Sequence, residues 1–156
     1  MSRDINDLCP AVRMKLEKLQ AAASAATPPI GFEVVYTLRT AAEEMALFAQ
    51  GRKTVEETNR LRHGAGMPPI TEEENRHIVT KVMTSIHMFG CAFDVAILKD
   101  GKIDWNAIPE YERLGALGEE LGFRWGGRFS FKDWGHFEYT GGLNLVELEA
   151  GKRPEA

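Results

Sequence analysis

The sequence has little cysteine, no excess of positive charge and no long hydrophobic run. Its two cysteines, Cys9 and Cys91, are too few for a disulfide framework and form no Cys-x-x-Cys motif, so two free thiols are the simplest interpretation, with one bridge left open. Nineteen Lys and Arg against 23 Asp and Glu give a net charge of −4, which argues against nucleic-acid binding and against a polybasic membrane-surface protein. No apolar run approaches the roughly 18 residues of a membrane-spanning helix, and the first ten residues, MSRDINDLCP, lack the pattern of a signal peptide. We therefore expect synthesis in the cytoplasm without membrane insertion.

The length of 156 residues suits one domain, because domains typically hold about 100–200 residues. No internal repeat or long low-complexity tract divides the chain, so we expect a single domain over 1–156 with its core at about 8–140. After Gly142 the sequence is acidic and weakly patterned, which predicts a weakly ordered C-terminal tail. A monomer is the default expectation.

Hydrophobic spacing predicts a mixture of helices and strands. In chain order, the expected elements are a helix with its apolar stripe over 8–19, a strand over 32–37, a helix beginning after Thr40, a strand over 92–98, a helix with its stripe over 111–121 and a strand over 136–139. Helices and strands do not alternate as regular βαβ units, so the predicted fold class is α+β.

The helix after Thr40 and the segment that follows it carry specific expectations. Thr40 and Glu43 have the spacing of a capping box, and Gln50-Gly51 is suited to the end of the helix. The side chains expected on its buried face are Met45, Phe48 and Ala49. The polar segment 51–74 is predicted to be a long loop with a helical turn near 55–61, and loops of this length often form the wall or lid of a site.

Two of the four histidines lie in short motifs that also hold an aspartate. The first motif, residues 85–94 (SIHMFGCAFD), contains His87 and Asp94. Both strand neighbours of Asp94 are apolar and share one face, so Asp94 points to the other face. A carboxylate in an apolar strand is costly unless it is paired or bound to a metal. The second motif, residues 133–136 (DWGH), again precedes a predicted strand.

Together the motifs supply two imidazoles and one carboxylate, with Asp133 three residues before His136. Two histidines, one acid and an open position are typical of a catalytic zinc site, and imidazole ligands favour zinc over calcium or magnesium. Zinc would lower the pKa of a bound water to about 7, and the nearby carboxylate would take its proton. The spacing alone leaves a purely structural role open, because histidines are often satisfied within a core and buried aspartates often cap turns.

Matching positions extend beyond these two motifs. The patterns are Ser85-x-His87-x-x-Gly90-x-Ala92-x-Asp94, Asp133-x-x-His136-Phe137-Glu138, Leu38-Arg39-Thr40, Gln50-Gly51-Arg52 and residues 118–127. In this order they resemble the zinc D-alanyl-D-alanine peptidase family, which includes vancomycin-resistance D,D-peptidases and phage and bacterial L-alanyl-D-glutamate peptidases. The Asp-x-x-His-Phe-Glu and Gln-Gly-Arg forms most resemble the L-alanyl-D-glutamate endopeptidase branch, typified by phage endolysins. The sequence departs from the family at Met88, where asparagine is common, and at Gly135, where proline is common.

The resemblance implies a role for each matching residue. The implied Zn²⁺ ligands are His87, Asp94 and His136. Asp133 is the implied general base, and Arg39 matches an arginine thought to stabilise the oxyanion of the tetrahedral intermediate. Ser85 matches a substrate-facing serine, although a serine two residues before a ligand could equally fix its loop by a hydrogen bond.

Other candidates are weaker. Glu138 could hold a ligand imidazole or form an ordinary salt bridge. Trp125 and Trp134 could line a peptide groove or pack in the core. His63 and His77 lie outside both motifs and are expected to be solvated.

The resemblance also implies a fold and a function. The fold is that of the D,D-peptidases and the hedgehog signalling domain, a small antiparallel sheet flanked by helices. The implied activity is zinc-dependent cleavage of the stem peptide of bacterial peptidoglycan between L-alanine and D-glutamate, by an endolysin made in the host cytoplasm and released through a holin-type pore. The alternatives are a D-alanyl-D-alanine carboxypeptidase, in which Arg39 or Arg128 would bind the terminal carboxylate, and a non-catalytic zinc-bearing interaction domain.

Overall fold

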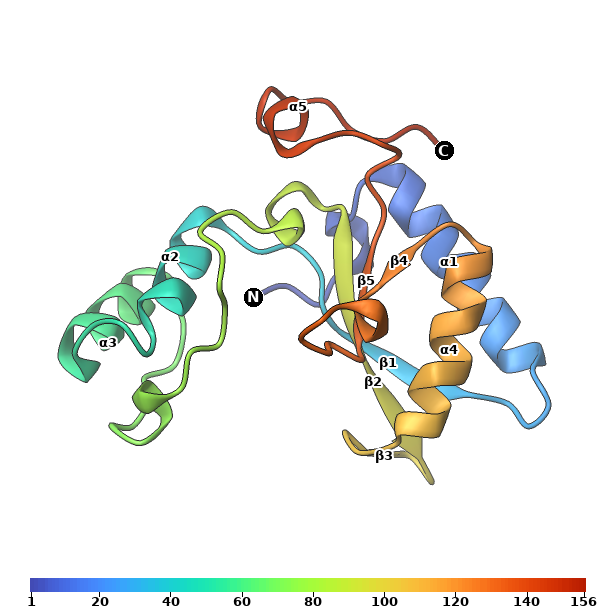
Figure 1. Cartoon of the computed structure of the whole chain (residues 1–156), viewed down its shortest axis with the longest axis horizontal. Helices are drawn as coiled ribbons and strands as arrows, with labels where there is room; N and C mark the ends of the chain where they lie inside the picture. The colour runs from blue at the N-terminus through green and yellow to red at the C-terminus, as the bar shows by residue number, and fades with distance from the viewer.

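In the computed structural model, which describes residues 1–156, five strands form one antiparallel sheet in the order β1-β2-β5-β4, with β3 paired to β2 (Figure 1). The strands are β1 (Gly31–Tyr36), β2 (Ala92–Lys99), β3 (Lys102–Ile103), β4 (Arg124–Trp125) and β5 (His136–Glu138). The helices are α1 (Pro10–Ala25), α2 (Ala41–Ala49), α3 (Val55–Gly64), α4 (Ile108–Glu120) and α5 (Leu145–Glu149). This confirms the predicted α+β class and its small antiparallel sheet. No helix is both long and apolar enough to cross a bilayer.

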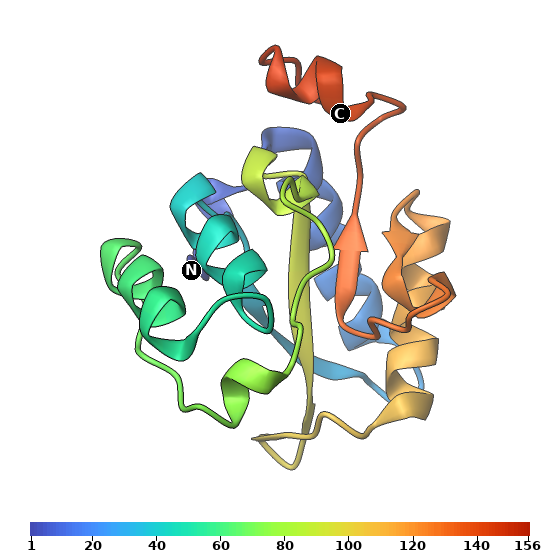
Figure 2. The same ribbon diagram turned by 60° about the vertical axis from the view of Figure 1, so that its left-hand side comes forward.

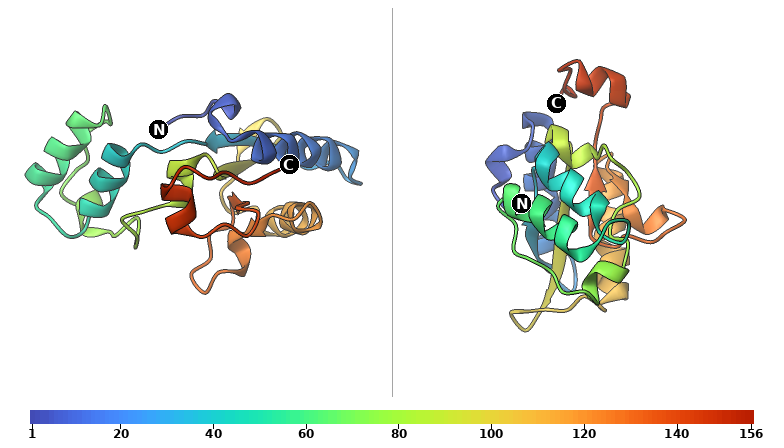
Figure 3. Two further views of the ribbon diagram at one scale, coloured as in Figure 1. Left: turned by 90° about the horizontal axis from the view of Figure 1, so that it is seen from above. Right: turned by 90° about the vertical axis from the view of Figure 1, so that its left-hand side faces the viewer.

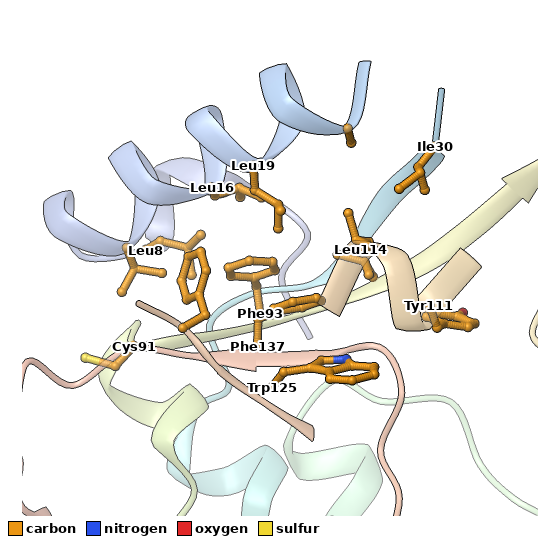
Figure 4. Packing of buried hydrophobic residues seen from close by; sticks show 14 of the residues in the cluster. Leu8, Leu16, Leu19, Ile30, Cys91, Phe93, Tyr111, Leu114, Trp125 and Phe137 are labelled. Carbon is orange, nitrogen blue, oxygen red and sulfur yellow. The ribbon is translucent and has the colours of Figure 1, made fainter. Parts of the chain in front are cut away.

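The hydrophobic core lies between one face of the sheet and the helices α1 and α4 (Figure 4). Phe93 on β2 and Phe137 on β5 are directly paired in the register, are fully buried, and stack with ring centroids 5.5 Å apart. Leu16 and Leu19 of α1 and Leu114 of α4 belong to the same buried cluster. Because side chains alternate across a strand, the residues on either side of Phe93 and Phe137 point away from this core.

Two glycines let α4 approach the sheet closely. A Cβ added at Gly118 would lie 2.5 Å from Cε1 of Phe137, and one at Gly115 would overlap the ring of Trp125. Both aromatic rings are buried, so neither can move aside without disturbing the core. The two helical positions therefore require the smallest residue.

Replacing Gly118 with alanine is expected to destabilise the fold. Overpacking of this kind costs about 1–3 kcal/mol, more than the gain of about 1 kcal/mol from better helix propensity. Urea unfolding should show the loss as a lower midpoint. The matched control is Gly64→Ala in α3, where an added Cβ meets nothing within 4 Å; equal effects of the two substitutions would contradict the packing argument.

Helices α2 and α3 lie beside the sheet, away from α1 and α4, and with residues 65–85 they form what we call the helical lobe (Figures 1 and 2). The predicted loop over 51–74 is wrong for its first half, because α3 is a helix of ten residues. Thr54 and Glu57 form a complete capping box at its start, but its sequence is mostly polar and its buried residues are Thr58 and Arg62, so no apolar face marks it as a helix. The helical turn predicted near 55–61 lies within this helix.

The predicted buried face of α2 is also wrong. Met45 is 54% exposed, whereas Glu43, Glu44, Ala46 and Ala49 are buried. Thr40 caps the helix by accepting from the amide of Glu43, and no reciprocal bond from the Glu43 carboxylate is present. The face that α2 turns inward thus carries two carboxylates, so it could not be recognised by hydrophobicity.

The C-terminal segment contains more structure than predicted. Asn144 and Glu147 form a capping box that opens α5, and Leu148 is buried. The helix contacts the short 3-10 turn Ile86–Phe89, and Figure 3 shows it at one end of the molecule. The segment after Gly142, for which the sequence predicts a weakly ordered tail, thus contains one short helix.

Candidate functional site

The sheet brings together two of the predicted ligands on the face opposite the core. Asp94 of β2 and His136 of β5 are direct partners in the antiparallel register, each next to the core phenylalanine of its own strand. His87 comes from the 3-10 turn Ile86–Phe89, which leads into β2. His136 lies 42 residues after Asp94, and the two meet because β2 pairs with β5.

Their donor atoms converge on one point. Nε2 of His87 lies 3.3 Å from Oδ2 of Asp94, and Nδ1 of His136 lies 3.1 Å from Oδ1 of the same carboxylate. The two imidazole nitrogens are 3.3 Å apart. All three donor atoms lie within 4.8 Å of one another, which is the spacing of ligands around one metal ion.

The outer nitrogens of both rings face acceptors. Nδ1 of His87 lies 2.8 Å from the carbonyl oxygen of Thr37, and Nε2 of His136 lies 2.8 Å from the Glu138 carboxylate. A neutral imidazole has one N–H, and a carbonyl or carboxylate can only accept, so each ring directs its N–H outward and its lone pair inward. Two imidazole lone pairs and a carboxylate then share the centre, and this donor set fits a transition-metal ion such as zinc.

Charge is balanced around this centre by neighbouring residues. Burial favours a raised pKa for Asp94, but hydrogen bonds with His136 and His87 overcome it and hold the pKa well below its usual range. Burial similarly disfavours the cationic form of His136, yet its bonds to Asp94 and Glu138 raise its pKa to about 10. Arg124 in turn pairs with Glu138 at 2.7 Å. The carboxylates around His136 therefore favour positive charge at the point where the donor atoms meet. That charge is a proton on Nδ1 of His136 or, once this proton is released, a metal ion.

Asp133 lies in the loop just before β5. Its carbonyl oxygen accepts from the amide of His136, and its own amide donates to Gly126, so the loop is closed against the strand. Burial raises the pKa of Asp133, the negative charge of Asp94 raises it further, and the histidines and Arg39 oppose the shift. A carboxylate with a raised pKa beside a metal centre is suited to accept and return a proton.

Arg39 lies where β1 leads into α2. Its amide donates to the carbonyl oxygen of His87, so its backbone is tied to a ligand residue. Its guanidinium pairs with Glu44 at 2.7 Å, and the side chain is mostly buried. Arg39 is thus joined to a predicted ligand residue through its backbone, and the catalytic roles of Arg39 and Asp133 stay predictions.

Ser85 has a local structural partner. Its hydroxyl accepts from the amide of His87 at 3.3 Å and caps the 3-10 turn. This contact fits the interpretation that the serine fixes the ligand loop. Its contact with a substrate stays a prediction.

A pocket of about 320 Å³ adjoins the donor centre. Asp94 and Asp133 form part of its lining, and the aromatic residues around it are Tyr36, Trp105, Tyr111 and Trp134. Trp125 lies instead in the core, with its indole N–H donating to the carbonyl oxygen of Trp134. His63 and His77 are exposed, in agreement with the sequence expectation.

Two contributors could not be found by motif. The backbone carbonyl oxygen of Thr37 orients the imidazole of His87, and a backbone contact of this kind cannot be recognised from the residue type. Glu44 is 0% exposed and binds Arg39, but in the sequence it is one of two adjacent glutamates in an amphipathic helix. The only sequence indication of this ion pair is that Arg39 and Glu44 carry opposite charges and are five residues apart.

Comparison with protein families finds a match over residues 79–139, a range that contains all three donors and Asp133. The matching family is described as D-alanyl-D-alanine carboxypeptidase. A second, short match over residues 54–74 is described as a HIND motif and lies in the helical lobe, outside the donor centre. No curated protein matches the chain.

Two solved structures have a similar fold. The L-Ala D-Glu endopeptidase ChiX of Serratia marcescens has a TM-score of 0.58 and 20% identity, over 87% of this chain and 83% of ChiX. A variant of the vancomycin resistance D,D-pentapeptidase VanY from a VanB-type resistance cassette, in complex with Zn(II), has a TM-score of 0.53 and 17% identity, over 92% of this chain and 76% of VanY. At these identities the likeness establishes the fold.

Proposed function

Because residues 79–139 match the family described as D-alanyl-D-alanine carboxypeptidase, we propose that the chain is a zinc-dependent peptidase of bacterial peptidoglycan. The observation that carries the proposal is the convergence of His87, Asp94 and His136, with both imidazole lone pairs directed at one point. Asp133 and Arg39 beside this point provide a base and a cation for hydrolysis of a peptide bond. The family match and the Zn(II) complex of the VanY neighbour both support zinc as the metal.

The proposed mechanism assigns one step to each residue. Zinc held by the three donors would polarise the scissile carbonyl and lower the pKa of water. Asp133 accepts a proton from the attacking water and later returns it to the leaving amine nitrogen. The guanidinium of Arg39 faces the negative charge that develops on the carbonyl oxygen, which is the interaction that lowers the barrier.

The bond that we propose is the one between L-alanine and D-glutamate. The Asp-x-x-His-Phe-Glu form of residues 133–138 supports it, as does the fold shared with ChiX, an endopeptidase of this specificity. The fold shared with VanY keeps a D,D-carboxypeptidase as the second candidate. A non-catalytic zinc-bearing domain is the third, and the presence of both Asp133 and Arg39 weighs against it.

Mass spectrometry of digested peptidoglycan, with and without a zinc chelator, separates the three candidates. A new amino terminus on D-glutamate that disappears with the chelator is the expected result. Loss of terminal D-alanine would select the carboxypeptidase instead. An unchanged wall with zinc bound would select the interaction domain.

We also propose the biological setting of a phage or prophage endolysin that acts as a monomer and reaches the wall through a membrane pore. The support is the endolysin-like form of the second motif and of Gln50-Gly51-Arg52. Expression in a bacterial host with and without a pore-forming protein tests it, because lysis should require the pore. Lysis without the pore would contradict this setting and leave the chemistry untouched.

Replacing Glu138 with glutamine is expected to weaken zinc binding by about 10–100-fold. The carboxylate accepts from Nε2 of His136 and so directs the opposite nitrogen toward the metal, whereas an amide can rotate its NH₂ group toward the ring. Competition with a chelator of known affinity measures the change. Glu119→Gln, which removes an exposed carboxylate that pairs with Arg128, is the control and should leave the affinity unchanged. Equal zinc affinity in the Glu138 variant would show that the ring is oriented by other contacts.

A further inference from the structure

Glu44 is the most deeply buried carboxylate of the helical lobe and the mechanism above gives it no role. It is 0% exposed, and its Oε2 lies 2.7 Å from a terminal nitrogen of Arg39. Its other oxygen accepts from the hydroxyl of Thr80 at 3.3 Å. An ionised carboxylate is retained in such a place only when its charge is compensated, and Arg39 is the cation that compensates it.

We infer that Glu44 is a positioning residue that holds the guanidinium of Arg39 toward the reaction centre, an inference that rests on the proposed function. The pair joins Glu44 of α2 to Arg39, which lies two residues before the helix begins, so the rigid helix sets the place of the flexible arginine side chain. The Nε atom of Arg39 is buried and has no partner within the protein. With one terminal nitrogen bound to Glu44, the remaining donors are left for the carbonyl oxygen of a substrate.

The same carboxylate also ties down the chain segment that leads to the first ligand. Thr80 bonds to Glu44, and the carbonyl oxygen of Thr80 accepts from Arg52, which also binds the end of α2. Five residues after Thr80, the hydroxyl of Ser85 caps the turn that carries His87. Helix α2 is therefore linked to the donor centre by two routes, through Arg39 and through the segment 80–87, and Glu44 belongs to both.

The charge of Glu44 matters more than its shape. Glutamine has almost the same volume but cannot neutralise Arg39, and its NH₂ group would face the guanidinium donors if misoriented. Arg39 would then lose its fixed direction, and misplacement of a positioning group by about 1 Å can reduce turnover about 10²-fold. Because Arg39 acts on charge that develops in the transition state, the loss should fall on kcat with KM little changed.

The test measures kcat, KM, zinc content and thermal stability for Glu44→Gln, Arg39→Ala and the double variant, with a synthetic stem peptide as substrate. We expect Glu44→Gln to lower kcat by about 10–100-fold with full zinc content, and to add little when Arg39 is already alanine. The matched control is Glu43→Gln, the neighbouring buried carboxylate, whose nearest cation is the amino terminus at 3.6 Å. It should retain wild-type kcat.

Each outcome bears on one proposal alone. Wild-type protein without peptidase activity would overturn the proposed function. If the wild type is active and Arg39→Ala is impaired, two results would overturn the positioning role of Glu44. One is wild-type kcat in Glu44→Gln, and the other is fully additive losses in the double variant. If Glu44→Gln does not fold, Thr80→Val removes only the second hydrogen bond of the carboxylate, and its kcat should fall about fivefold, the value of one hydrogen bond. Unchanged kcat in a folded Thr80→Val would then count against the inference.

Discussion

Replacing Asp133 with alanine is expected to lower kcat by about 10²–10⁴-fold while zinc stays bound, because the substitution removes the proposed proton acceptor. Asp133 makes its contacts to His136 and Gly126 through the backbone, so the side chain can be removed without breaking the closure of the loop. Steady-state kinetics on a stem peptide, together with metal analysis of the purified variant, measure both parts of the prediction.

Two variants make this result specific. Asp133→Asn keeps the volume and removes the basicity, so it should lose nearly as much activity as alanine. Lys132→Ala changes the adjacent residue, whose side chain donates to the carbonyl oxygen of Gly127, and should keep most of the turnover. Turnover close to wild type in Asp133→Asn would assign the base to another group.

Replacing His136 with alanine should abolish zinc binding and activity together. The residue supplies one of three donors, and the two that remain cannot complete the coordination of a catalytic zinc. Wild-type protein should gain thermal stability on addition of zinc, since an ion that binds the native state stabilises it by mass action. The variant should show no such shift and should contain no zinc after dialysis.

The control for this experiment is His63→Ala, which removes an exposed histidine of α3. Its zinc content, activity and zinc-dependent stabilisation should match the wild type. Stoichiometric zinc in the His136 variant would mean that the metal binds elsewhere, whatever the activity.

The donor centre could be predicted from the sequence because its geometry is coded locally. Asp94 stands between apolar residues of a strand, and alternation alone places it opposite the core. His136 ends the second motif and begins β5, and the family resemblance pairs the two motifs. The register that joins them is visible only in the structure, where Asp94 of β2 is the direct partner of His136 of β5.

The helical lobe could not be predicted in the same way. Its buried positions include Glu44, Thr58 and Arg62, which are all polar residues. Glu44 pairs with Arg39 and accepts from Thr80, and Arg62 donates to the carbonyl oxygen of Pro68. Hydrophobic periodicity detects a face that is buried against apolar neighbours, and it fails where burial is balanced by charge. The same limit explains why Met45 is expected on the buried face of α2 from the sequence, although the structure exposes it and buries Glu44 instead.

The pairing of β2 with β5 has a consequence for how this site tolerates change in length. Asp94 and His136 face the donor centre only because Phe93 and Phe137 face the core, and the amide of Val95 bonding to Gly135 fixes the same alignment beyond the strand end. Insertion or deletion of a single residue within either strand would exchange the two faces, burying the carboxylate and exposing a ring. Length variation can therefore be absorbed in the turns of this chain. Within β2 or β5, a change in length of one residue is enough to disrupt the donor centre.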